Sequence, residues 1–85
     1  EICEFRSRSR QAASLNRAAR LAAILANRWG IPMRNIVPHK HWPRWDFRYG
    51  KPCPRILLER DPRARGGRRL GEKWKRFIAR VKWYR

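Results

Sequence analysis

The chain has 85 residues, of which 23 are Lys or Arg and 6 are Asp or Glu, so its net charge is +17. This length supports one modest core, and no apolar run approaches the roughly 20 residues that span a bilayer, so no membrane span is expected. Two cysteines are too few for a disulfide-framework domain. The positive field favours a polyanionic partner: nucleic acid, an acidic lipid surface, or a bacterial wall rich in carboxylate and phosphate. A GC-rich coding bias would produce the same Arg- and Ala-rich composition, so charge alone does not identify the partner.

The N-terminal third predicts a strand followed by a helix. Residues 2–5 are typical of the end of a strand, in which Cys3 is expected to be a buried small apolar residue. From about residue 11 to 29, leucine and alanine recur at spacings of three and four, which predicts a helix that Gly30 ends. Trp29 lies on the apolar face of this helix and is expected in the core, and Trp74 is expected there too.

The middle of the chain is less regular. Residues 35–37 form a short β-type run that Pro38 should end. Residues 42–54 are rich in proline and aromatic side chains and predict an irregular loop. A short helical turn is expected at 55–59, and a flexible basic connector at 61–69.

A second amphipathic helix is predicted at about 70–84, because apolar residues recur there at helical spacing. The order strand, helix, strand, loop, helix indicates an α/β fold class with a partial mixed sheet flanked by helices. We expect residues 1–85 to form a single domain.

A possible metal site follows the second apolar run. His39 lies at the end of this run, and Cys53 lies between two prolines with Lys51 two residues before it. Imidazole and thiolate are both good ligands for Zn²⁺. A lysine beside such a metal can stabilise negative charge on a reacting carbonyl oxygen. The pattern therefore predicts a metal-assisted hydrolase.

Three motifs in order carry a family resemblance: Glu-Ile-Cys-Glu at 1–4, Ile-Val-Pro-His-Lys-His-Trp at 36–42, and Gly-Lys-Pro-Cys-Pro at 50–54. Together with the two predicted helices, they resemble the zinc-dependent N-acetylmuramoyl-L-alanine amidases of phage endolysins and bacterial autolysins. These enzymes share their fold with peptidoglycan-recognition proteins. The resemblance covers most of the chain and implies the C-terminal part of such a domain, truncated at its N-terminus.

The resemblance also implies roles for single residues. His39 and Cys53 would be zinc ligands, Glu1 would orient or deprotonate the metal-bound water, and Lys51 would stabilise the oxyanion. His41, which alternates with His39, is a less favoured substitute ligand. The bond cleaved would be the amide between N-acetylmuramic acid and L-alanine in peptidoglycan.

Two tryptophans near this site, Trp42 and Trp45, could stack on sugar rings or anchor the loop. The chain departs from the family in two respects. The family's first zinc histidine would precede Glu1, and Cys53 follows His39 by 14 residues, which is longer than expected. The surplus, residues 43–49, is most simply a loop insertion near the site.

Two other functions compete with the amidase interpretation. One is a non-catalytic peptidoglycan-binding module, against which Cys53 argues because a pure binder needs no thiol ligand. The other is a small basic nucleic-acid-binding protein, which is less favoured. The amidase interpretation implies peptidoglycan as partner and an extracellular or cell-wall location, although no export signal is visible. It leaves the oligomeric state open.

Overall fold

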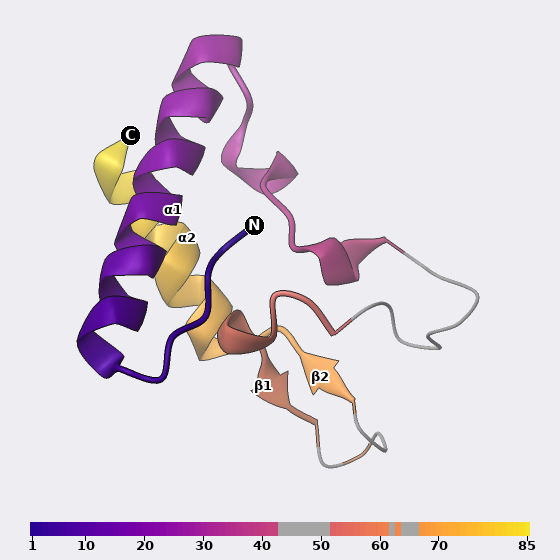
Figure 1. Cartoon of the computed structure of the whole chain (residues 1–85). Coiled ribbons are helices and arrows are strands. Elements are labelled where there is room, and N and C mark those ends of the chain that lie inside the picture. Colours follow the sequence, from indigo (N-terminus) through magenta and orange to yellow (C-terminus); the bar gives the residue numbers. More distant parts are fainter. Residues whose placement is uncertain (43–51, 62, 64–66) are drawn as a thin grey trace. The chain divides into compact units, whose positions relative to one another are not determined.

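The computed structural model describes residues 1–42, 52–61, 63 and 67–85 (Figure 1). In this part of the chain it contains two α-helices and a two-stranded antiparallel sheet, so the fold is mixed α/β as predicted. The chain divides into two units: Glu1–Ile36 with Arg76–Arg85, and Val37–Lys75. None of the described helices is both long enough and apolar enough to cross a membrane.

The first unit is built around helix α1 (Arg8–Trp29). The helix begins before the predicted residue 11 because Ser7 caps it: the Ser7 side chain accepts a hydrogen bond from the backbone N–H of Arg10. It ends as predicted at Gly30, which adopts the left-handed conformation (φ 60°) that a residue without a side chain enters at little cost.

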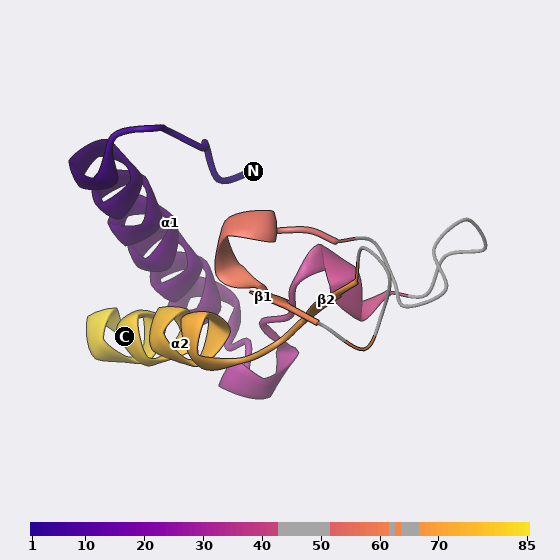
Figure 2. The ribbon, with the colours of Figure 1, turned by 90° about the horizontal axis from the view of Figure 1, so that it is seen from below.

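The second helix, α2 (Glu72–Tyr84), contributes its residues from Arg76 onward to the same unit. In Figures 1 and 2 this part of α2 passes alongside α1. Small side chains on α1 allow close approach, and larger ones on α2 fill the space. The buried apolar side chains of the unit are Ala19, Ala23, Ala26, Phe77 and Val81.

Polar contacts at the margins of this core also join α1 to the C-terminal part of the chain. Asn16 Oδ1 accepts a hydrogen bond from Arg80 Nη1 at 2.6 Å. One turn further along α1, the Arg20 guanidinium lies 5.8 Å from the centroid of the Tyr84 ring. Near the end of α1, Asn27 Oδ1 accepts from Arg85 Nε at 3.2 Å. In these pairs the residue number rises along α1 and along the C-terminal segment together, so the two helices run in the same direction where they meet.

The N-terminal segment differs from its prediction. Residues 2–5 are not a strand, because their backbone groups bond to side chains of α1 and not to a neighbouring strand. The Cys3 carbonyl accepts from Ser14 Oγ at 3.0 Å and from Gln11 Nε2 at 3.2 Å, and the Phe5 N–H donates to Gln11 Oε1 at 2.7 Å. The prediction that Cys3 is buried is also wrong, since the residue is exposed.

The predicted strand at 35–37 is also wrong. A short 3-10 helix, η1 (Met33–Asn35), occupies the start of this segment. The Pro32 carbonyl accepts the backbone N–H of Asn35 at 2.9 Å, and this local bond closes a turn where an extended chain was expected.

The two tryptophans assigned to the core have different surroundings. Trp29 is 62% exposed, so its assignment to the core is wrong. The Arg28 guanidinium lies 5.1 Å from the centroid of its ring, a cation–π geometry that a surface tryptophan can adopt. Trp74 is half-buried.

The second unit contains the only ladder among the described residues. Strands β1 (Glu59–Arg60) and β2 (Arg68–Arg69) pair antiparallel, with Glu59 opposite Arg69. The mixed sheet expected from the N-terminal runs is therefore not found in the described part of the chain, and β2 forms where a flexible connector was predicted. The predicted turn at 55–59 is confirmed by the 3-10 helix η3 (Arg55–Leu57).

The hairpin also fixes the start of α2. Glu59 Oε1 accepts the backbone N–H of Lys73 at 3.1 Å, so a strand carboxylate satisfies one of the free donors of the helix's first turn. Gly71, which precedes the helix, leaves room for this contact, because a Cβ there would lie 2.5 Å from Glu59 Cγ.

Candidate functional site

The first part of the candidate site is a short turn that presents the predicted histidine. Pro38 is buried, and the 3-10 helix η2 (His39–His41) follows it. The turn is closed by the His41 N–H, which donates to the Pro38 carbonyl at 2.9 Å. The buried proline fixes the base of the turn, and the His39 side chain is exposed to solvent.

The second part is the segment that carries the cysteine. Cys53 is half-buried and has a free thiol, and the Cys53–Pro54 peptide bond is cis. Immediately afterwards η3 turns the chain, and Leu57 and Leu58 are buried. Two adjacent buried leucines thus follow Cys53 within five residues.

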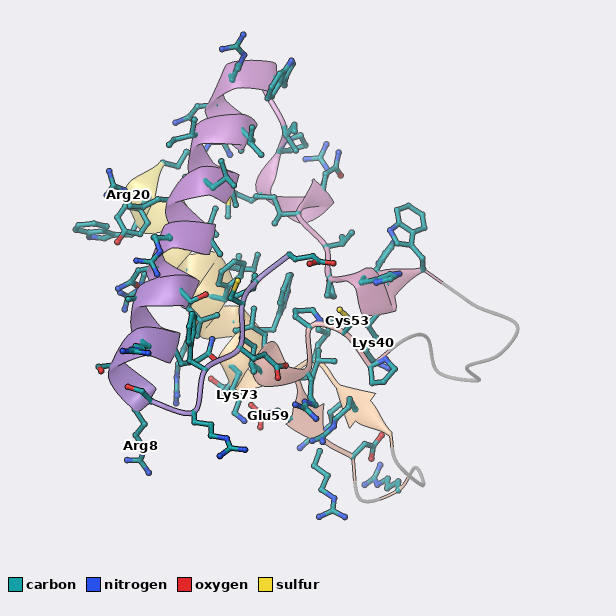
Figure 3. The ribbon with its side chains drawn as sticks, viewed as in Figure 1. Arg8, Arg20, Lys40, Cys53, Glu59 and Lys73 are labelled. Atoms are coloured by element: carbon teal, nitrogen blue, oxygen red, sulfur yellow. The ribbon has the colours of Figure 1, made fainter. Side chains whose placement is uncertain are left out.

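A backbone hydrogen bond joins these two segments. The Lys40 N–H donates to the Cys53 carbonyl at 2.9 Å, and Figure 3 shows the two residues on neighbouring stretches of chain. Lys40 directly follows His39, so His39 and Cys53 lie on adjacent stretches of backbone within one unit of the structure.

This hydrogen bond places the backbones of two residues with zinc-binding side-chain types on adjacent segments. Imidazole nitrogen and thiolate sulfur both suit a tetrahedral Zn²⁺ site, and a catalytic site takes about three protein ligands and a water. Over residues 1–42, 52–61, 63 and 67–85 there is no group of three or more His, Cys, Asp or Glu side chains placed to hold a metal ion. The described segments therefore provide at most a pair of ligands.

The remaining predicted site residues are distributed differently. Glu1 is exposed and belongs to the unit of residues 1–36 and 76–85, whereas His39 and Cys53 belong to the other unit. Lys51 lies outside the described residues.

The aromatic residues assigned to substrate binding are also only partly described. Trp42 is 60% exposed, and its ring meets the His41 ring edge-on at a centroid distance of 4.9 Å. His41 is itself exposed. Trp45 lies outside the described residues, as does the whole insertion 43–49.

Two features of this site were not anticipated from the sequence. One is the role of Lys40, which joins the segments through its backbone N–H, a group that every residue except proline carries. No sequence signal could have identified it. The other is the burial of Leu57 and Leu58 shortly after Cys53, which the apolar run at 56–58 would have indicated.

Comparison with known proteins adds no family. No model of a protein family matches the chain, and neither a curated protein nor a solved structure matches it. The structure itself shows a small mixed α/β fold over its described residues, in which a hydrogen bond joins the His39 and Cys53 segments.

Proposed function

We propose that the chain is part of a zinc-dependent peptidoglycan amidase, which hydrolyses the amide between N-acetylmuramic acid and L-alanine. The observation that carries the proposal is the 2.9 Å hydrogen bond from Lys40 N–H to the Cys53 carbonyl. Because of it, the two residues that the motifs nominate as zinc ligands lie on adjacent segments.

The donor set fits zinc better than other common metals. One imidazole and one thiolate are borderline and soft ligands, which favour Zn²⁺ over Mg²⁺ or Ca²⁺. The amidase resemblance supplies a further histidine from a position before Glu1, which would complete a catalytic set of three. Zinc bound there would lower the pKa of its water to about 7 and polarise the substrate carbonyl.

The chain's own residues take the other roles. The Glu1 carboxylate accepts the proton of the attacking water. The Lys51 ammonium stabilises the negative charge that develops on the carbonyl oxygen during the attack. The exposed Trp42 ring, next to the His39–His41 turn, offers an apolar face on which a sugar of the glycan can stack.

Zinc affinity tests the proposed ligand pair. The chain is titrated with Zn²⁺ in competition with a chromophoric chelator, and release of L-alanine amino termini from peptidoglycan is followed in parallel. We expect His39→Ala and Cys53→Ser each to weaken zinc binding by about tenfold or more. Loss of the thiolate removes a ligand outright, and loss of the imidazole does the same.

The chain offers a matched control for the cysteine. Cys3→Ser makes the same chemical change in the other unit, at an exposed residue that the proposal does not use. Its zinc affinity should equal that of the unsubstituted chain. Equal zinc affinities for Cys3→Ser and Cys53→Ser would contradict the proposal.

A further inference from the structure

Helix α1 carries large apolar side chains that remain substantially exposed in the described structure. Leu21, Leu25 and Trp29 follow each other at intervals of four residues and form one row along the helix, and Ile24 lies in the adjoining row. These side chains are between 39% and 62% exposed. We call the surface formed by these four residues the outer face of α1. Leu21 and Ile24 project away from the buried alanines, and Leu25 and Trp29 extend the surface toward one side of them.

Arginines flank this outer face. Arg17 precedes Leu21 in the first row, and Arg20 and Arg28 lie on either side of Ile24 in the second, all with exposed side chains. Helix α1 contains no Asp or Glu at all. The outer face thus combines large apolar side chains with arginines, of which Arg17 and Arg28 lie in the same rows as the apolar residues and Arg20 lies beside Ile24, and α1 has no carboxylate to neutralise them.

We propose that the outer face of α1 binds the surface of an anionic lipid bilayer. A helix that lies in the membrane interface combines large apolar side chains with Arg or Lys, and it gains both from apolar burial and from attraction to anionic headgroups. Trp29 suits this position because an indole ring favours the boundary between hydrocarbon and headgroups. The helix would lie in the interface and would not span it.

Charge complementarity distinguishes this partner from a second copy of the chain. Two copies would each bring a net charge of +17 and would place the arginines of one outer face against those of the other. Nucleic acid would satisfy the arginines through its phosphates but would leave the leucines and the isoleucine in water. An anionic bilayer satisfies both kinds of side chain.

Cosedimentation with lipid vesicles tests the proposal. The chain is mixed with vesicles of phosphatidylglycerol and phosphatidylcholine in equal parts, and separately with vesicles of phosphatidylcholine alone. We expect partitioning to be at least about tenfold stronger for the anionic vesicles. Leu21→Gln and Ile24→Gln should each weaken it by about fivefold, because each removes an apolar side chain from the interface. Gln has nearly the helix propensity of Leu, so α1 should remain folded by circular dichroism.

Matched controls lie elsewhere on the chain. Leu70→Gln changes an exposed leucine outside α1 and should leave partitioning unchanged. Arg17→Gln should weaken binding to anionic vesicles by about fivefold, whereas Arg34→Gln, at an exposed arginine outside α1, should have a smaller effect.

Three results would overturn the proposal. The first is equal partitioning to the two kinds of vesicle. The second is unchanged vesicle binding by both Leu21→Gln and Ile24→Gln. The third is that the chain and these two variants bind duplex DNA with equal affinity, and more tightly than they bind the vesicles. The same variants should keep the zinc affinity of the unsubstituted chain. Failure of the lipid proposal can thus be told apart from failure of the amidase proposal.

Discussion

The Glu59 carboxylate acts at the start of α2 in place of the capping side chain that Gly71 lacks. It comes from the neighbouring strand and accepts the Lys73 N–H at 3.1 Å. A negative charge at this end of a helix is also favoured by the helix dipole. One side chain thereby couples the hairpin to the helix.

Removing this carboxylate should destabilise the fold. We expect Glu59→Ala to lower the free energy of unfolding by about 1 kcal/mol, because the Lys73 N–H loses its partner. Glu59→Gln keeps an oxygen acceptor and should lower the free energy of unfolding by less than Glu59→Ala does. Urea denaturation followed by circular dichroism measures both values. A Glu59→Ala variant as stable as the unsubstituted chain would show that water replaces the carboxylate without loss.

Gly71 belongs to the same contact. An added Cβ would lie 2.5 Å from Glu59 Cγ, so the glutamate would have to move away from the helix. Gly71→Ala should therefore resemble Glu59→Ala in stability. The glycine is needed here because of a close approach, not because of its backbone angles.

At the scale of elements, the packing of α1 and α2 depends on size complementarity. Ala19, Ala23 and Ala26 on α1 are fully or nearly fully buried, and Val81 on α2 has no exposed surface. A core with so few large side chains is sensitive to the loss of any one of them.

We expect Val81→Ala to lower the free energy of unfolding by about 2 kcal/mol, since it removes two buried methyl groups and leaves a cavity. Lys82→Ala, at the exposed neighbouring position, should change it by less than about 0.5 kcal/mol. Chemical denaturation of the two variants gives the comparison. Similar values for both variants would contradict the assignment of Val81 to a tightly packed core, because alanine is the better helix former at both positions.

The helices could be predicted from the sequence, whereas the strands could not. The Ala and Leu periodicity of α1 and the Gly30 cap are local signals, and the structure contains both. Runs such as 2–5 and 35–37 are too short for periodicity to separate a strand from a turn. Residues 2–5 bond instead to the side chains of Gln11 and Ser14, and the backbone N–H of Asn35 bonds to the Pro32 carbonyl, so neither run forms a strand.

The candidate site was predictable only in part, for a related reason. The residue types at His39 and Cys53 suggested zinc, but their proximity could not be derived from a separation of 14 residues. The family resemblance supplied that expectation. The hydrogen bond between Lys40 and Cys53 is consistent with it, and depends on a backbone contact that no side-chain pattern encodes.

At the scale of the whole molecule, the two units have separate proposed tasks. The unit Val37–Lys75 holds the proposed zinc ligands, and the other unit carries the outer face of α1. Glu1, to which the amidase proposal assigns the role of proton acceptor, belongs to the first unit. The net charge of +17 would hold both units near an anionic cell envelope.

The most direct measurement is X-ray absorption at the zinc edge of the zinc-loaded chain. The proposal predicts one sulfur at about 2.3 Å and nitrogen or oxygen neighbours at about 2.0 Å. The sulfur signal should persist in Cys3→Ser and disappear in Cys53→Ser. A zinc shell without sulfur, or one whose sulfur is lost in Cys3→Ser, would contradict the proposal.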